Sequence, residues 1–337
     1  MSARTVHIDI AVNGAFITRR WEEPRNFMRL TREVGYRYHE FCADVLDPFF
    51  SGDRAYQMQT AREIKAAAQE FGVTIIDIYT GVATHRFHGL SHTNPACRRR
   101  MREWIEQTMD IALEMGTDRI GGHWDAFSVE VLDDPMRTQA AWNNIVQQFR
   151  ELAVIAKKKG LAAIYDEQMY VPSEIPWTLA QGEAFLREVN TGNEGVPVYL
   201  TVDVGHQAGQ NYGLSHPDTS YEEWVRRFGA VAEVVHVQQT IPTASAHWPF
   251  TPQYNAQGHV SVPKVLDALR ASHEQFVAGP LASCMKPVER CHLVAEIIPS
   301  STKDEKTLLR ELSETAEFLR QFVPDGGLTW SFPGAAA

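Results

Sequence analysis

The 337 residues of this chain include 32 basic and 42 acidic side chains, a formal net charge of −10 that disfavours binding to a phosphate backbone. With 44% hydrophobic residues the chain can bury a large core, which excludes a disordered polymer. Its apolar runs fall far short of the roughly 20 residues that span a bilayer, and no long apolar stretch follows the first arginine. We therefore expect a soluble, cytoplasmic protein whose partners are neither nucleic acids nor membranes.

Short apolar runs alternate with longer segments of helical periodicity along the whole chain, and eight such pairs can be counted. The expected strands are 5–12, 36–42, 73–79, 119–122, 161–167, 198–203, 231–239 and 293–298. The helices expected to follow them are 24–34, 54–71, 95–115, 135–159, 177–189, 221–228, 263–272 and 303–322.

The two kinds of connection differ in length. Helix-to-strand turns are short and several contain a glycine that can end the helix, whereas strand-to-helix connections such as 80–94 and 240–262 are long. This asymmetry predicts an α/β fold, a (β/α)8 TIM barrel with long βα loops and its active site at the carboxyl ends of the strands. An open doubly wound sheet is the alternative, but no glycine-rich phosphate turn follows the first strand. We expect a single domain over 1–337, with a C-terminal tail at 323–337.

Polar residues end four of the expected strands, although a buried parallel strand should be almost wholly apolar. They are Glu167, Asp203, His236 and Glu296. Each alone could cap a helix or be a hydrogen-bonded core residue. Together, in the mouth of a barrel, they form an oxygen-rich set with one imidazole, which suits a divalent ion such as Mn²⁺ or Mg²⁺.

These residues resemble the sugar isomerase and epimerase barrels of the xylose isomerase-like superfamily, which include tagatose 3-epimerase. The resemblance covers nearly the whole chain and includes the DxxH arrangement of Asp203 and His206. It implies that Glu167, Asp203, His236 and Glu296 hold a divalent ion, Mn²⁺ first and Mg²⁺, Co²⁺ or Zn²⁺ as alternatives, and that His206 contacts the substrate. One departure is the His-Val-Gln-Gln sequence that begins at His236, where many relatives place an acidic residue or a lysine.

By this resemblance the chain is a metal-dependent carbohydrate enzyme that removes a proton next to a carbonyl through a metal-stabilised enediolate. Glu167 and Glu296 would remove and return the proton. One alternative is the catalytic subunit of a C-glycoside deglycosidase, a carbon–carbon lyase that needs a small partner subunit. Another is a phosphodiesterase of the endonuclease IV type, which the net charge disfavours. The expected partners are a carbohydrate or glycoside substrate and further copies of the chain.

Further candidates lie in the expected loops at the barrel mouth. His123 follows a pair of glycines, and we consider it either a general acid/base or a group that hydrogen-bonds a ligand carboxylate. Trp124, Trp248 and Gln238 are predicted substrate contacts. The aromatic faces of the two tryptophans suit a sugar ring or an aryl group.

Overall fold

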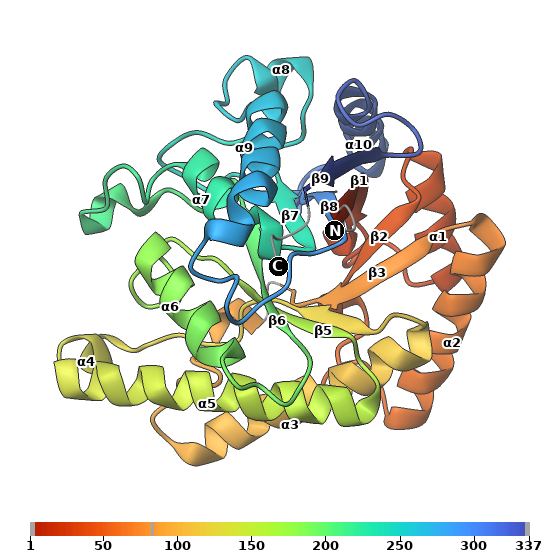
Figure 1. Ribbon diagram of the computed structural model, residues 1–337. Helices are drawn as coiled ribbons and strands as arrows, with labels where there is room; N and C mark the ends of the chain where they lie inside the picture. The colour runs from red at the N-terminus through yellow and green to blue at the C-terminus, as the bar shows by residue number, and fades with distance from the viewer. Residues whose placement is uncertain (1–3, 82–83, 334–337) are drawn as a thin grey trace.

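Eight parallel strands close a barrel in the computed structural model, which describes residues 4–81 and 84–333 (Figure 1). Consecutive strands pair with one another, and β1 pairs with both β8 and β2, so that the sheet closes. The (β/α)8 barrel predicted from the sequence is confirmed. The barrel strands are β1 (Arg4–Asn13), β2 (Tyr38–Cys42), β3 (Thr74–Tyr79), β4 (Arg119–Gly121), β5 (Ala163–Glu167), β6 (Val198–Asp203), β7 (Val234–Val237) and β8 (Arg290–Ala295).

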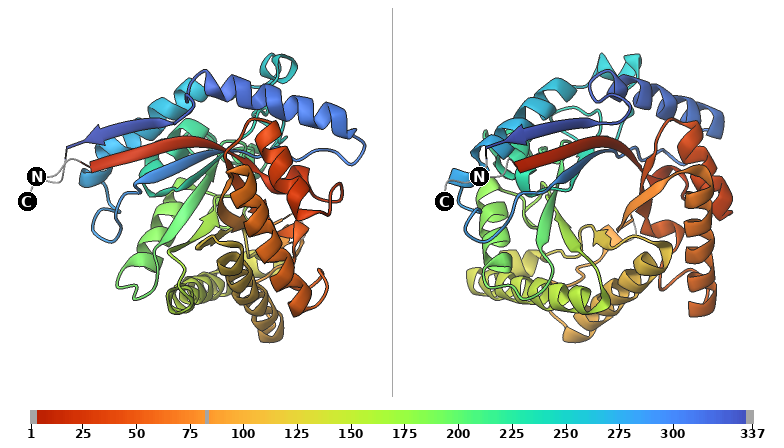
Figure 2. Two further views of the ribbon diagram at one scale, coloured as in Figure 1. Left: turned by 90° about the vertical axis from the view of Figure 1, so that its right-hand side faces the viewer. Right: turned by 45° about the vertical axis from the view of Figure 1, so that its right-hand side comes forward.

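A ring of helices surrounds the barrel, as both views of Figure 2 show. Helices α2, α3 and α5 end at Gly72, Gly116 and Gly160, each in the left-handed conformation that turns the chain back toward the next strand. The long helices are α1 (Pro24–Glu33), α2 (Arg54–Phe71), α3 (Pro95–Met115), α5 (Pro135–Lys159), α6 (Leu179–Asn190), α7 (Tyr221–Phe228), α9 (Val262–Gln275) and α10 (Glu305–Arg320). Two short helices, α4 (Val129–Leu132) and α8 (Pro252–Asn255), lie in the long strand-to-helix connections. Among the described residues, no helix is long and apolar enough to cross a membrane.

The segment predicted as a C-terminal tail contains a ninth strand, β9 (Leu328–Phe332). It runs antiparallel to the first half of β1, and Figure 2 shows the two side by side in dark blue and red. Its alternation of apolar and small polar residues, Leu-Thr-Trp-Ser-Phe, is typical of a strand with one buried face. The first half of β1 therefore has neighbours on both sides, while its end is left to pair with β2.

The last barrel strand begins at Arg290, three residues earlier than expected. Arg290 and His292 interrupt the apolar pattern, which by itself indicated the later start. Pairing with β1 over six residues nevertheless keeps this segment extended. Glu296 consequently lies directly after β8, at the mouth of the barrel, where the sequence placed it.

Apolar side chains fill the barrel interior below this mouth. They form a cluster of Ala11, Ile76, Tyr79, Ala163, Tyr165, Val234 and Val294, and the main core lies between strands and helices. The Tyr79 ring lies 4.7 Å from the ring of His236, so the aromatic layer directly supports the polar residues at the mouth.

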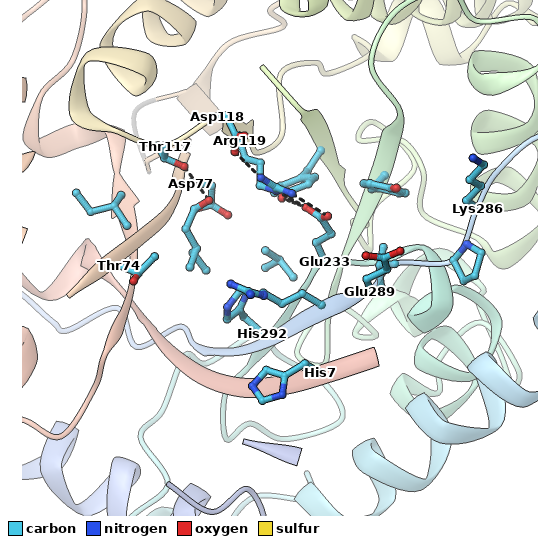
Figure 3. A pocket seen from close by; sticks show the side chains of 18 of the residues that line it. His7, Thr74, Asp77, Thr117, Asp118, Arg119, Glu233, Lys286, Glu289 and His292 are labelled. Carbon is cyan, nitrogen blue, oxygen red and sulfur yellow. Dashed lines mark hydrogen bonds and ion pairs between the residues drawn. The ribbon is translucent and has the colours of Figure 1, made fainter. Parts of the chain in front are cut away.

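A cavity of about 610 Å³ opens at the opposite end of the barrel, where the strands begin. Figure 3 shows Asp77 and Arg119 among the side chains that line it. The Arg119 guanidinium already pairs with Glu233, at 2.5 Å, and with Asp118. Its charge is therefore offset within the protein. The polar residues singled out from the sequence lie at the other end of the barrel.

Candidate active site and metal centre

Four side chains from neighbouring strands meet at the carboxyl end of the barrel. Glu167 ends β5, Asp203 ends β6, His236 lies in β7, and Glu296 follows β8. One potential ligand atom from each lies within 4.8 Å of the others, and all four residues are buried. The parallel register places Asp203 directly beside His236. The structure thus brings together the residues that the sequence suggested as metal ligands.

The imidazole of His236 is held in a defined orientation. Its Nδ1 lies 3.2 Å from Glu167 Oε1 and 3.4 Å from Glu296 Oε2, whereas its Nε2 lies 3.0 and 3.1 Å from the two oxygens of Glu40. Asn13 donates a hydrogen bond of 2.6 Å to Glu40 and fixes it in turn. With an ion bound, the Nε2 proton would be directed at Glu40 and the Nδ1 lone pair at the cluster, as in the carboxylate–histidine pairs that support bound metals.

Sequence reasoning missed Glu40, although a usable signal was present. Glu40 lies within the expected strand 36–42 and is completely buried, the same departure from an apolar strand that identified the other residues.

His247 was also missed. Its Nδ1 lies 3.2 Å from Glu296 Oε2, but it belongs to the long connection between β7 and α9, where no periodicity predicts the direction of a side chain.

The charges in the cluster shift one another's pKa values. Burial raises the pKa of Glu296, but the imidazoles of His236 and His247 outweigh it and hold the pKa well below its ordinary value. Burial likewise lowers the pKa of His236, but Glu40 and Glu296 outweigh it and raise the pKa. Burial and the charge of Glu296 raise the pKa of Asp203 to about 6, against the opposing effect of His206. Several carboxylates therefore compete for few cationic partners.

A divalent cation fits this set of donors. Three carboxylates and one imidazole, without a thiolate, match the preferences of Mn²⁺, Mg²⁺ and related ions, and a cation would relieve the repulsion among the carboxylates. Glu167, Asp203, Glu296 and Nδ1 of His236 would hold the ion.

Two other predicted contacts border the cluster. His206 Nδ1 donates a hydrogen bond of 2.7 Å to the carbonyl of Gln168, and its Nε2 lies 3.3 Å from Asp203 Oδ2. Gln238 is completely buried, donates to both oxygens of Asp203 at 3.1 and 3.0 Å, and accepts from the backbone of His247 at 2.6 Å. The Gln238 amide therefore orients Asp203, and its contact with a substrate stays a prediction.

The two predicted tryptophan contacts lie in different surroundings. Trp124 is 1% exposed and stacks on Phe149 of α5 at 5.6 Å, so it packs between barrel and helices. The substrate contact expected for Trp124 from its position in a mouth loop stays a prediction. Trp248 is partly exposed and stacks on Tyr254 at 5.2 Å, within the connection between β7 and α9.

His123 follows a turn that requires glycine. Gly122 has a φ of +138°, and a Cβ there would lie 1.7 Å from Thr80 Oγ1, so the close backbone approach expected from the glycine pair is present. His123 itself is buried, and its Nδ1 lies 3.9 Å from Asp125 Oδ1. Burial and the neighbouring His85 lower the pKa of His123 to about 3. Its role as an acid/base stays a prediction.

Comparisons with known proteins agree with this architecture. A curated D-erythrulose 1-phosphate 3-epimerase of Brucella abortus (strain 2308) is 22% identical over 262 residues, 77% of this chain and 83% of that protein. A structure from Rhodospirillum rubrum ATCC 11170, provisionally described as a xylose isomerase, has a TM-score of 0.79 at 22% identity and covers 94% of this chain and 100% of that chain. D-psicose 3-epimerase with D-tagatose, from Clostridium cellulolyticum H10, has a TM-score of 0.65 at 17% identity and covers 94% and 99%. The model of the xylose isomerase-like TIM barrel family matches residues 28–286, most of the length, and the chain belongs to that family.

Proposed function

We propose that this chain is a divalent-metal-dependent sugar epimerase or isomerase that moves a proton on a carbon next to a carbonyl. One observation carries the proposal. Two glutamates, Glu167 and Glu296, lie together at the barrel mouth as members of a four-residue set that could hold a metal ion. The resemblance to a curated 3-epimerase of a ketose phosphate supports the same type of reaction.

The two glutamates are suited to moving the proton. The pKa of each is lowered, because neighbouring imidazoles outweigh the effect of burial, so both are carboxylates that can accept a proton at neutral pH. One would take the proton from the substrate carbon and the other would return a proton to the opposite face. A bound divalent ion would polarise the substrate oxygens and stabilise the charge that develops there.

Two histidines complete the proposed site. Burial lowers the pKa of His247, but contact with Glu296 outweighs it and raises the pKa to about 9, so His247 is protonated at neutral pH and keeps Glu296 ionised. His206 borders Asp203 and lies 4.8 Å from the ring of Tyr170, which places it to contact a substrate oxygen.

The contacts of Arg20, one of the basic residues near the mouth, favour a substrate without phosphate. Arg20 donates to Glu305 and to the carbonyls of Lys303 and Ser300, so its guanidinium is already occupied. The phosphorylated substrate named for the Brucella relative is therefore a competing choice, and we include it in the test.

The decisive experiment follows solvent deuterium into the substrate. Mn²⁺-loaded protein is incubated in deuterated water with free ketoses, ketose 1-phosphates and a 3-oxo-C-glycoside, and exchange next to the carbonyl is measured by NMR. We expect exchange and a new epimer or isomer with a free ketose. Release of an aryl group from the C-glycoside would instead support the lyase alternative, which requires the same proton abstraction.

Glu296→Gln provides the matched test of the site. A neutral amide is a poor base and a weaker ligand, so this variant should lose at least about 100-fold in exchange rate and bind Mn²⁺ less tightly. The control is Glu317→Gln, which makes the same change at an exposed position of α10. Full activity of Glu296→Gln, or loss of activity in both variants, would refute the assignment.

A further inference from the structure

A second group of metal-binding side chains lies beside β4 and β5. His123 and Asp125 follow β4, and Asp166 is the penultimate residue of β5. One donor atom from each lies within 4.8 Å of the others. Neighbouring residues of a strand face opposite sides, so Asp166 and Glu167 point away from each other. None of the three residues belongs to the four-residue cluster, although Glu167 and His206 also influence the pKa of His123, and the two-glutamate mechanism leaves Asp125 and Asp166 without a role.

Most polar atoms of this group have no partner. Both nitrogens of His123, both carboxylate oxygens of Asp166 and Oδ1 of Asp125 are buried and make no hydrogen bond. None of the three residues is more than 1% exposed. The hydrogen bond that the group does receive comes from Ser91, which donates to Asp125 Oδ2 at 3.1 Å. Buried polar atoms are normally paired, so five unpaired atoms in one place indicate a missing partner.

The surroundings of the two aspartates favour a cation as the missing partner. The charged groups that act most strongly on the two aspartates, apart from each other, are Glu174 and Glu167, which are both acidic. Over residues 4–81 and 84–333, no lysine or arginine forms an ion pair with Asp125 or Asp166. The nearest basic group, the His123 imidazole, lies 3.9 Å from Asp125, beyond hydrogen-bonding distance. Two buried carboxylates without a compensating positive charge are unfavourable.

We propose that His123, Asp125 and Asp166 bind a second divalent ion, of the Zn²⁺ or Mn²⁺ type. One imidazole and two carboxylates are donors that such ions accept at about 2.0–2.2 Å, so that ligand atoms in a tetrahedral site lie about 3.3–3.6 Å apart. The donor atoms now lie up to 4.8 Å apart, and side-chain movements that shorten these distances by about an ångström would close them around an ion. Because Ser91 holds Asp125, the ion would join the β3–α3 connection, the end of β4 and β5.

The ion content of the intact protein tests this proposal directly. Protein loaded with Zn²⁺ and freed of excess metal by gel filtration is analysed by inductively coupled plasma mass spectrometry. We expect two ions per wild-type chain and one in Asp166→Asn and Asp125→Asn. Asp133→Asn, which removes an exposed carboxylate from the same connection, is the matched control and should retain two.

Thermal unfolding of the same proteins shows whether a variant has simply lost its fold. The melting temperature of the wild type should rise with a second equivalent of Zn²⁺, and this rise should be absent from Asp166→Asn, with circular dichroism confirming the native fold before heating. If Asp166→Asn does not fold, Asp125→Asn provides the same comparison.

One ion per wild-type chain, or two ions retained in both variants, would overturn the proposal. The two aspartates would then share a proton or hold water. Failure of the proposed function looks different, because deuterium exchange would be absent while the count of two ions remained.

Discussion

The carboxylate of Glu40 should determine how tightly the barrel binds its metal, although Glu40 itself is not among the four candidate ligands. Both of its oxygens lie within 3.1 Å of His236 Nε2, and it is completely buried. Glu40→Gln keeps the size of the side chain but removes the negative charge. The amide also brings a donor that competes with the hydrogen bond from Asn13.

The expected magnitude follows from the role of such partners. Loss of the group that orients a metal-binding histidine typically costs 10-fold to 100-fold in metal affinity, about 1.4–2.7 kcal/mol. The amide can still accept one hydrogen bond from His236, so we expect the lower half of this range for Glu40→Gln. Glu40→Ala, which retains no acceptor, should reach the upper half.

Isothermal titration of the metal-free protein with Mn²⁺ measures this effect without any assumption about the substrate. Glu311→Gln is the control, because it neutralises another buried carboxylate that pairs with Lys303, on the side of α10. The control should leave the Mn²⁺ affinity within twofold of the wild type.

A double-mutant cycle with His236→Gln separates an effect of Glu40 that acts through His236 from an effect that is independent of His236. If Glu40 acts through His236, the Glu40→Gln change should have little further effect in the His236→Gln background. Equal losses in both backgrounds, or an unchanged affinity of Glu40→Gln, would refute the reasoning.

Two further predictions follow from the structure. His236→Ala should lower metal occupancy, whereas His206→Ala should spare occupancy and raise KM, as measured by metal analysis and steady-state kinetics; equal metal loss would contradict this division of roles. Burial, with a smaller contribution from Arg4, lowers the pKa of His273 to about 4, so between pH 6.5 and 4 the unfolded chain binds a proton that the folded chain does not. His273 therefore contributes to the free energy of unfolding fully above pH 6.5. This contribution should fall by about 2 kcal/mol when the pH is lowered to 5. Urea unfolding at pH 7 and pH 5 should show this loss reduced in His273→Gln, with His7→Gln as the control for a histidine on the neighbouring β1; equal pH dependence in wild type and His273→Gln would contradict it.

The order of the elements could be derived from the sequence because hydrophobic periodicity and helix-ending glycines are local properties. Gly72, Gly116 and Gly160 end their helices in the structure as their positions suggested. The convergence of Glu167, Asp203 and Glu296 also followed from sequence, since parallel strands in a closed barrel bring their carboxyl ends together whatever the details of packing. Polar residues at those ends therefore had to meet.

The directions of side chains outside the strand ends depended on tertiary contacts. Trp124 and Gln238 lie in the expected mouth, but Trp124 packs on Phe149 and Gln238 binds Asp203, because the nearest large ring and the nearest carboxylate come from other elements. His247 reaches Glu296 through a long connection whose path has no periodic signal. Asp166 lies close to His123 only because β4 and β5 are neighbours. Sequence alone determines which residues stand at the mouth, whereas the partner of each is decided by packing between segments far apart in the chain.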